Sequence, residues 1–551
     1  MPICDPENII STMFQQNESL TCPFKNPLTI LNPDGQLSLN SLGLRNITCF
    51  CSFLRRNNQN EDFNLYSASL KLEHGTAVQM NATSNSMNVT CNAATGVRVY
   101  TNTHLYIPLF YSREETSPSK PNVLIFIVES LPALSFKRLM KKTKSAIDEM
   151  SFRYFDYFVK SGENSFPNTM ALLTGTQYTK VMEERTKKDY FDNQATYLWE
   201  YFKNQGYTTG WMEDLPQIGV FNYGKSGFWK QPVDFYPHAF WTQMFPEHAE
   251  WNDMLHMRNP KDFCFHDNGY KTNIFLDQVI EFVGKNRLHP YFLCATYIQI
   301  THDDINNLQI VDHFFPPFFN RLKTLADNTI IVFAGDHGFR NGLNTPTSFG
   351  RLEERLTLFS IFVHDNIRRK YPHLQETISI NRNRLTTWFD IHLMMKQIAD
   401  GSFAKIPDPV VDRAKPINPL THVIPSGRTC THAGIPIIHC VCGNRVHLDP
   451  RTSGIDDDIL DVRNVTLDLL NRYDCDAKNK LRMTSMHYDI PMNTSDIMEK
   501  VTACFASNRM ETSICFNLTR NMTDADQFEL PHFHIDDTFF QKNPAFCSSW
   551  N

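Results

Sequence analysis

Short apolar runs recur through the middle of the 551-residue chain and alternate with segments of helical periodicity. The runs span residues 123–128, 207–212, 291–298, 329–334 and 358–363. Between them, segments 195–204 and 271–286 carry apolar side chains three to four positions apart, the spacing of one helix face. Strands that alternate with helices predict a mostly parallel sheet between two helical layers, an α/β/α sandwich.

The two flanks of the chain have a different composition, rich in Cys, Asn, Ser and Thr. Twelve of the 14 cysteines lie there, and short alternating runs such as 66–72 and 96–100 predict β-structure in the first flank. We therefore predict three parts: a Cys-rich, β-containing N-terminal region (1–105), the α/β domain (106–406) and a Cys-rich C-terminal region (407–551).

Eight Asn-x-Ser/Thr acceptor triplets also lie outside the middle of the chain. They begin at Asn17, Asn46, Asn81, Asn88, Asn464, Asn493, Asn517 and Asn521. Sequons confined to Cys-rich flanks predict a glycosylated, disulfide-bonded protein of the cell exterior or the secretory-pathway lumen.

Cys430, Cys440 and Cys442, with His432 and His439 nearby, permit two interpretations. They have donors for a metal site, but paired thiols in an oxidising compartment form disulfides unless a metal is already bound. We favour disulfides here.

The net charge of −6 is mild for this length and gives no reason to expect nucleic acid or a membrane surface as a partner. No stretch of about 18 apolar residues is present that would span a membrane. The start, MPICDPENIISTMF, has no apolar core of a signal peptide. We expect an ectodomain from which a targeting segment or anchor has been trimmed.

Polar side chains follow several of the apolar runs directly, where open α/β sheets carry their chemistry. Glu129 follows the first run, His302 the third, and Asp336 and His337 the fourth, while Ser165 follows a Gly/Asn-rich turn. These groups form a plausible set of ligands for a divalent ion that activates a serine hydroxyl. Taken singly, Glu129 also fits a helix cap or a solvated carboxylate, and Ser165 a plain N-cap.

The segments NVLIFIVES, GENSFPNTMALLTGT and FAGDHGFRNG, in this order, resemble the alkaline phosphatase superfamily. Together with GRLEERL and IPSGRTCTHAGIPIIHCVCGN, they look most like an uncharacterised sulfatase-like ectodomain family expanded in nematodes and arthropods. The resemblance implies an alkaline-phosphatase-like fold, with Glu129, Ser165, Asp336 and His337 at the shared metal site. Ser165 falls on the nucleophile position.

The chain departs from the relatives at several positions. Phosphodiesterases of the superfamily usually have Asp and Thr where this chain has Glu129 and Ser165, although lipoteichoic acid synthases share the Glu. Sulfatases need Ser and Arg where Asn168 and Thr169 follow Pro167. No late histidine matches the second-ion ligand of two-zinc enzymes.

We therefore predict one divalent ion, Zn or Mn, and leave a second open. His302 is expected to face the leaving group, and His302, Asp303, Asp304 and Asp214 are the groups available for a second ion or for substrate.

The predicted function is metal-dependent hydrolysis or transfer of a phosphoester, of the kind that phosphodiesterases carry out, with a lipid or glycan headgroup among the candidate substrates. Two alternatives stay open: an inactive sulfatase-like ectodomain that binds a partner, and a sulfatase with formylglycine at position 165.

Overall fold

A computed structural model describes most of the chain up to residue 441 and five strands beyond it. The described ranges are 21–22, 26–40, 46–59, 64–110, 120–178, 189–244, 263–265, 269–340, 348–405, 416–436 and 439–441, followed by the backbone of 446–448, 481–489, 498–507, 514–521 and 533–535. The chain divides into two compact units: Met1–Asn341 with Glu353–His439, and Gly342–Leu352 with Cys440–Asn551.

The first unit contains a six-stranded sheet in the order β10-β14-β13-β9-β12-β11. Its strands are β9 (Asn122–Val128), β10 (Arg153–Tyr154), β11 (Thr208–Glu213), β12 (Tyr291–Tyr297), β13 (Thr329–Gly335) and β14 (Phe359–Val363). Strand β9 pairs in parallel with β12 and β13, and β12 with β11, whereas β14 and β10 pair antiparallel. Each of the five apolar runs forms a strand. Four of these strands, β9, β11, β12 and β13, are parallel neighbours, so the predicted mostly parallel sheet is confirmed.

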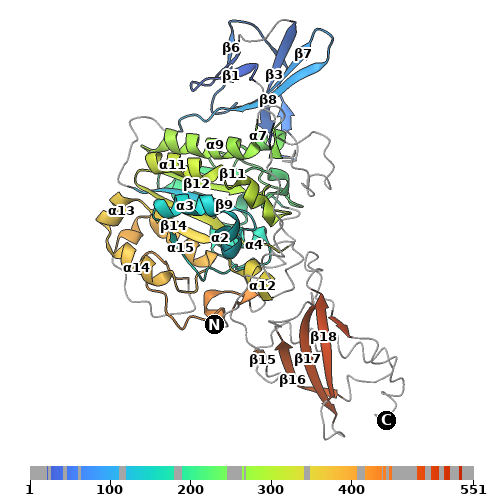
Figure 1. Ribbon diagram of the computed structural model, residues 1–551, viewed down its shortest axis with the longest axis vertical. Helices are drawn as coiled ribbons and strands as arrows, with labels where there is room; N and C mark the ends of the chain where they lie inside the picture. Colours follow the sequence, from blue (N-terminus) through green and yellow to red (C-terminus); the bar gives the residue numbers. More distant parts are fainter. Residues whose placement is uncertain are drawn as a thin grey trace. The chain divides into compact units, whose positions relative to one another are not determined.

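Helices cover both faces of this sheet because β9 alternates its apolar side chains between two cores. Leu124, Phe126 and Val128 point into one core, and Val123, Ile125 and Ile127 into the other. The first core is closed by α2 (Ala133–Leu139), α3 (Lys141–Glu149), α9 (Lys271–Asn286) and α11 (Phe315–Leu325). The second is closed by α4 (Ser165–Thr174), α6 (Leu198–Asn204) and α15 (Trp388–Ala399). In Figure 1 the strands lie between α9 and α11 above and α15 below, which confirms the α/β/α sandwich.

Shorter helices complete the unit, and both predicted helices are present. The shorter helices are α7 (His238–Gln243), α10 (Leu308–Val311), α13 (Asp365–Lys370) and α14 (His373–Asn381), together with the last residues, from Glu353 on, of α12 (Ser348–Arg355). Helix α9 has the predicted bounds. Helix α6 begins three residues later than predicted, where the Glu200 carboxylate accepts the N–H of Tyr197 at 3.2 Å and caps the first turn.

The N-terminal residues form small antiparallel sheets, as predicted. One sheet contains β1 (Thr29–Leu31), β2 (Gln36–Leu39) and β6 (Ala77–Gln79). The other contains β3 (Ile47–Arg56), β4 (Asn64–Tyr66), β5 (Leu70–Leu72), β7 (Ser86–Ala93) and β8 (Arg98–Leu105).

One disulfide lies within the second of these sheets, and another joins the N-terminal region to the α/β region. Cys49–Cys91 links β3 to β7, and Cys22–Cys264 spans 242 residues. Among the described residues, Cys51 and Cys294 are free and buried.

The described strands of the second unit form an antiparallel sheet. They are β15 (Val446–Leu448), β16 (Leu481–Asp489), β17 (Met498–Ser507), β18 (Ile514–Asn521) and β19 (Phe533–Ile535). Cys430 and Cys440 each take part in a disulfide, as the disulfide interpretation predicted, while Cys442 lies outside the described residues. The predicted boundaries at residues 105 and 406 stay predictions.

The glycosylation acceptors also stay predictions. Asn46 and Asn81 are exposed, Asn88 is half-buried on β7, and Asn517 and Asn521 lie on β18. Asn17, Asn464 and Asn493 lie outside the described residues. No helix in the described part of the chain is long and apolar enough to cross a membrane.

Candidate active site

Three neighbouring parallel strands end at one edge of the sheet and bring distant parts of the sequence together. Val128, the last residue of β9, lies opposite Tyr297 of β12 on one side and Gly335 of β13 on the other. Glu129 follows β9, His302 lies in the turns after β12, and Asp336 and His337 follow β13. This edge of the sheet, at the carboxyl ends of the strands, is where the sequence analysis expected the chemistry.

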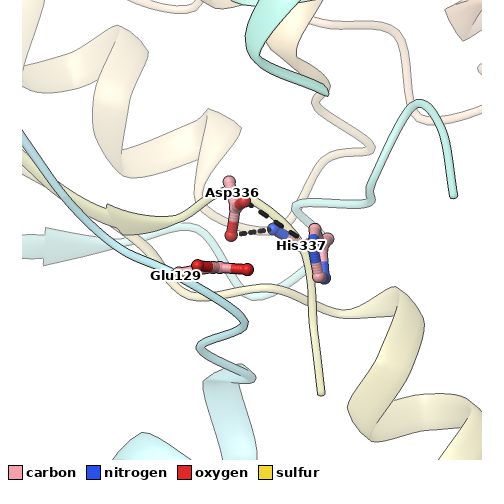
Figure 2. Close-up of side chains that lie close together, drawn as sticks. All are labelled: Glu129, Asp336 and His337. Carbon is pink, nitrogen blue, oxygen red and sulfur yellow. Dashed lines mark hydrogen bonds and ion pairs between the residues drawn. The ribbon is translucent and has the colours of Figure 1, made fainter. Parts of the chain in front are cut away.

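Glu129, Asp336 and His337 form a compact buried cluster (Figure 2). One ligand atom from each lies within 4.8 Å of the others, and the three residues are 6%, 1% and 1% exposed. Such a set of two carboxylates and one imidazole is suited to a divalent transition ion.

Asp336 divides its two carboxylate oxygens between different tasks. Oδ1 accepts the backbone N–H groups of Ser130 and His337, each at 2.8 Å. Oδ2 is buried and has no hydrogen-bond partner among the described residues. A buried carboxylate oxygen without a donor is costly, and a cation bound there would remove the cost.

The backbone around Glu129 is held in an unusual conformation. Ser130 has a φ of +52°, a left-handed value that few residues other than glycine adopt. This conformation lets the Ser130 N–H reach Asp336 directly after the strand ends. Strain of this kind collects at functional sites.

His337 directs one ring nitrogen, Nε2, toward the cluster, 3.6 Å from Asp336 Oδ2. Its Nδ1 lies 2.7 Å from the carbonyl oxygen of Gly338, and because a carbonyl only accepts, Nδ1 carries the proton. Nε2 therefore offers its lone pair, and burial lowers the pKa of His337, which keeps the ring neutral. A neutral imidazole oriented in this way fits a metal ligand.

Burial raises the pKa of Glu129 to about 8, with the nearby Asp336 acting in the same direction against the charge of His302. A bound divalent ion would stabilise the ionised form of this carboxylate, which burial alone disfavours. Together with the unpartnered Asp336 oxygen, this environment fits a metal ion.

Ser165 is the first residue of α4 and faces the cluster. Its hydroxyl donates to Glu129 Oε1 at 3.3 Å and lies 3.2 Å from His337 Nε2. The structure therefore places the Ser165 hydroxyl beside the cluster of Glu129, Asp336 and His337, the residues with which the sequence analysis grouped it.

Asn168 holds the turn that presents Ser165, and the sequence analysis assigned it no such role. Its Oδ1 accepts the N–H groups of Ser161 and Gly162, and its Nδ2 donates to the carbonyls of Gly162 and Asn164. Gly162 is required for close approach, because a Cβ there would lie 2.5 Å from Pro167 Cβ. A polar Asn near the start of an otherwise apolar helix was the available signal.

His302 lies at the edge of the cluster. Its Nε2 is 3.9 Å from Glu129 Oε1, and its Nδ1 is 2.7 Å from Asp303 Oδ1. Burial opposes protonation, but the charge of Glu129 and the contact with Asp303 outweigh it and raise the pKa of His302 to about 9.

Two other carboxylates, those of Asp214 and Asp304, accept hydrogen bonds from backbone N–H groups instead. Asp214 accepts the N–H groups of Ile298 and Gln299, and Asp304 accepts that of Asn306 at the start of a short 3-10 helix. Neither belongs to the cluster of Glu129, Asp336 and His337.

A second cluster contains Glu163, Glu354 and His439, whose ligand atoms also lie within 4.8 Å of one another. The ammonium of Lys160 lies 2.5 Å from Glu354 Oε1 and 3.4 Å from Glu163 Oε2, so a cation of the chain itself already compensates these carboxylates.

Arg340, in the turn after His337, is a further cation that the sequence analysis missed. Its guanidinium acts electrostatically on Glu129, His302 and His337. The half-buried Arg340 adds positive charge near the cluster of Glu129, Asp336 and His337.

A family model described as "Protein of unknown function (DUF229)" matches residues 6–524. A search of the curated proteins found no match.

Several solved structures are similar at low identity. The C-terminal periplasmic domain of EcEptC from Escherichia coli, in complex with Zn, is 13% identical, with a TM-score of 0.33 over 52% of this chain and 84% of that one. A protein in the alkaline phosphatase superfamily from Vibrio parahaemolyticus is 12% identical, with a TM-score of 0.33 over 79% and 88%. The lipoteichoic acid synthase LtaP from Listeria monocytogenes is 11% identical, with a TM-score of 0.28 over 46% and 68%.

Proposed function

Because the chain belongs to the DUF229 family, whose description assigns no activity, we propose its function from the geometry of the site. The protein is a metal-dependent phosphoester hydrolase or phosphotransferase, with Ser165 as nucleophile. The observation that carries the proposal is the position of the Ser165 hydroxyl, 3.3 Å from Glu129 Oε1 and 3.2 Å from His337 Nε2. In the same cluster, Asp336 Oδ2 accepts no hydrogen bond from any residue that the structure describes.

Glu129, Asp336, His337 and Ser165 would hold one divalent ion, Zn or Mn. When bound, the ion would lower the pKa of the serine hydroxyl and offset negative charge on the phosphoryl oxygens. The buried carboxylates and the fixed His337 tautomer supply a preorganised set of ligands for it.

Ser165 Oγ attacks phosphorus, and the bond from phosphorus to the leaving oxygen breaks as a phosphoserine forms. Protonated His302 donates its proton to the leaving oxygen, and Asp303 orients its ring from the other side. Water or a second alcohol then releases the phosphoryl group from Ser165, giving hydrolysis or transfer respectively.

Positive charge around Ser165 supports an anionic substrate. Arg340 and protonated His302 bring two positive charges beside the nucleophile, and such charges stabilise developing negative charge on phosphoryl oxygens. Disulfides in the first unit support a place outside the cell or in the secretory lumen, where a lipid or glycan headgroup would carry the phosphoester.

The turn around Ser165 weighs against a sulfatase. Asn168 stands where the formylglycine motif needs Ser, and its side chain binds four backbone groups of the turn. The intact mass of the peptide that contains residue 165 tests this directly, because conversion to formylglycine changes the mass.

The proposal is tested by metal analysis and kinetics on the purified protein. We expect stoichiometric Zn or Mn, turnover on a panel of phosphodiesters and phosphomonoesters, and loss of turnover in Ser165→Ala. Ser402→Ala, a serine of a short 3-10 helix outside the site, is the control and should retain activity. A protein without stoichiometric ion whose Ser165→Ala variant behaves as wild type would support the inactive binding protein instead.

A further inference from the structure

Lys160 is a buried cation five residues before the nucleophile. Its side chain is 0% exposed, and its ammonium has three acceptors at fixed distances. These are Glu354 Oε1 at 2.5 Å, the carbonyl oxygen of Glu163 at 3.2 Å and Glu163 Oε2 at 3.4 Å. An ammonium is buried this completely only when its partners compensate the loss of water.

The partners of Lys160 lie on two segments that are far apart in the sequence. Glu163 belongs to the turn that leads to Ser165, and Glu354 lies near the end of α12, 194 residues after Lys160. The backbone N–H of Lys160 also donates to the carbonyl of Arg355 at 3.1 Å. The nucleophile turn is therefore tied to α12 by both the side chain and the backbone of Lys160.

The same end of α12 also holds the turn of His337. The N–H of Gly338 donates to the carbonyl of Glu354 at 3.0 Å. The approach is so close that a Cβ on Gly338 would lie 1.8 Å from the carbonyl oxygen of Glu353. Glu354 thus contacts the nucleophile turn through its side chain and the His337 turn through its backbone.

We propose that Lys160 is a positioning residue that locks the turn of Ser165 to the turn of His337 through Glu354. It sets the 3.2 Å separation between Ser165 Oγ and His337 Nε2 without touching substrate. The inference rests on the proposed function, because that function gives Ser165 and His337 their roles.

The test compares the single variant Lys160→Met with the double variant Lys160→Met/Glu354→Met. The single variant leaves Glu354 buried without its cation and should melt at a lower temperature. The double variant removes the two buried partners, Lys160 and Glu354, which is often neutral for stability when the replacements are apolar and of similar volume. The Glu163 carboxylate also loses its cation, but its side chain is 21% exposed and keeps contact with water. In the double variant the backbone carbonyl of residue 354 can still accept the hydrogen bond from Gly338 N–H. The hydrogen bond from the Lys160 ammonium to the carbonyl oxygen of Glu163 is lost.

We expect the double variant to recover its melting temperature but not its activity. Its kcat should stay at least about 10-fold below wild type, with KM changed much less, because small displacements of reacting groups cost rate steeply. Its affinity for Zn²⁺ should fall, and the visible spectrum of the Co²⁺-substituted protein should change, since both report the ligand geometry.

Arg428→Met is the matched control, because it breaks another buried ion pair, with Asp390 on α15. It should lose stability but keep the kcat and the Co²⁺ spectrum. A double variant with wild-type kcat, Zn²⁺ affinity and Co²⁺ spectrum would overturn the inference and leave the proposed function standing. A wild-type protein that binds no ion and turns over no phosphoester would instead overturn the proposed function, and the inference with it.

Discussion

The substitution Asp336→Asn separates the two tasks of one carboxylate. Asn keeps the Oδ1 that accepts the N–H groups of Ser130 and His337 at 2.8 Å, so the turn retains its hydrogen bonds. It replaces Oδ2, the buried oxygen without a hydrogen-bond partner in the described part of the chain, with an amide nitrogen that cannot bind a cation. We expect a folded protein that has lost its ion.

The magnitude follows from linkage between binding and folding. At a free ion concentration 1,000 times Kd, a ligand that binds only the folded state stabilises it by about 4.1 kcal/mol. For a chain of 551 residues, an unfolding entropy of about 2.1 cal/mol/K per residue gives about 1.2 kcal/mol/K in total. Adding the ion should therefore raise the Tm of the wild type by about 3 °C.

The assay is thermal unfolding of chelated and Zn-loaded protein, with the metal content measured in parallel. Asp336→Asn should show no ion-dependent shift, and without ion it should melt at or above the chelated wild type, because a buried charge beside Glu129 is gone. Asp303→Asn, which changes a carboxylate 2.7 Å from His302 but outside the cluster, should keep the full shift. An Asp336→Asn protein that is stabilised by Zn²⁺ as much as wild type would refute the assignment of Asp336 as a ligand.

Three further predictions test the surroundings of the site. Asn168→Ala removes four hydrogen bonds and should lower the free energy of unfolding, measured in urea, by about 3 kcal/mol. The control Asn366→Ala, at an exposed position, should change it little, and an equal loss of stability in both variants would contradict the role of Asn168. Burial raises the pKa of Asp214 to about 7 from 3.8, so its stabilising contribution is present below pH 3.8 and is lost as pH rises through 7, a change of about 4 kcal/mol. Asp214→Asn should thus flatten the fall of stability between pH 4 and 8, and an unchanged slope would refute this reasoning. Gly338→Ala should weaken Zn²⁺ binding in a calorimetric titration by about 10-fold or more, because its Cβ would overlap a backbone oxygen of α12. The control Gly284→Ala, whose Cβ would meet its nearest neighbouring atom at 3.7 Å, should bind Zn²⁺ as the wild type does. Equal Zn²⁺ affinities of the two variants would argue against the close approach at Gly338.

Much of the fold was readable from the apolar pattern. The run at 123–128 is apolar throughout because β9 is buried on both faces by helices, and such a strand leaves a continuous signal in the sequence. The two-residue strand β10 was not predicted, because it depends on pairing with β14, much later in the chain. The antiparallel direction of β14 beside β13 was not predicted either, because an apolar run carries no signal of strand direction.

The residues that support the site were harder to predict than its ligands. Lys160 and Glu354 are 194 residues apart, and neither position carries a signal that names the other. Arg340 stands within the segment FAGDHGFRNG that carries the family resemblance, but no role was predicted for it. Its electrostatic effect on Glu129 depends on the conformation of the turn after β13.

The sequence by itself determined the kinds of element and the order of polar groups at their ends. Glu129, His302 and the pair Asp336–His337 each follow an apolar strand, and so does Asp214, so local pattern alone could not rank them. Only the tertiary structure decided between them, because β9 lies between β12 and β13 and brings Glu129 beside Asp336 and His337. Asp214 instead satisfies the backbone after β12, a partner that no spacing along the chain reveals.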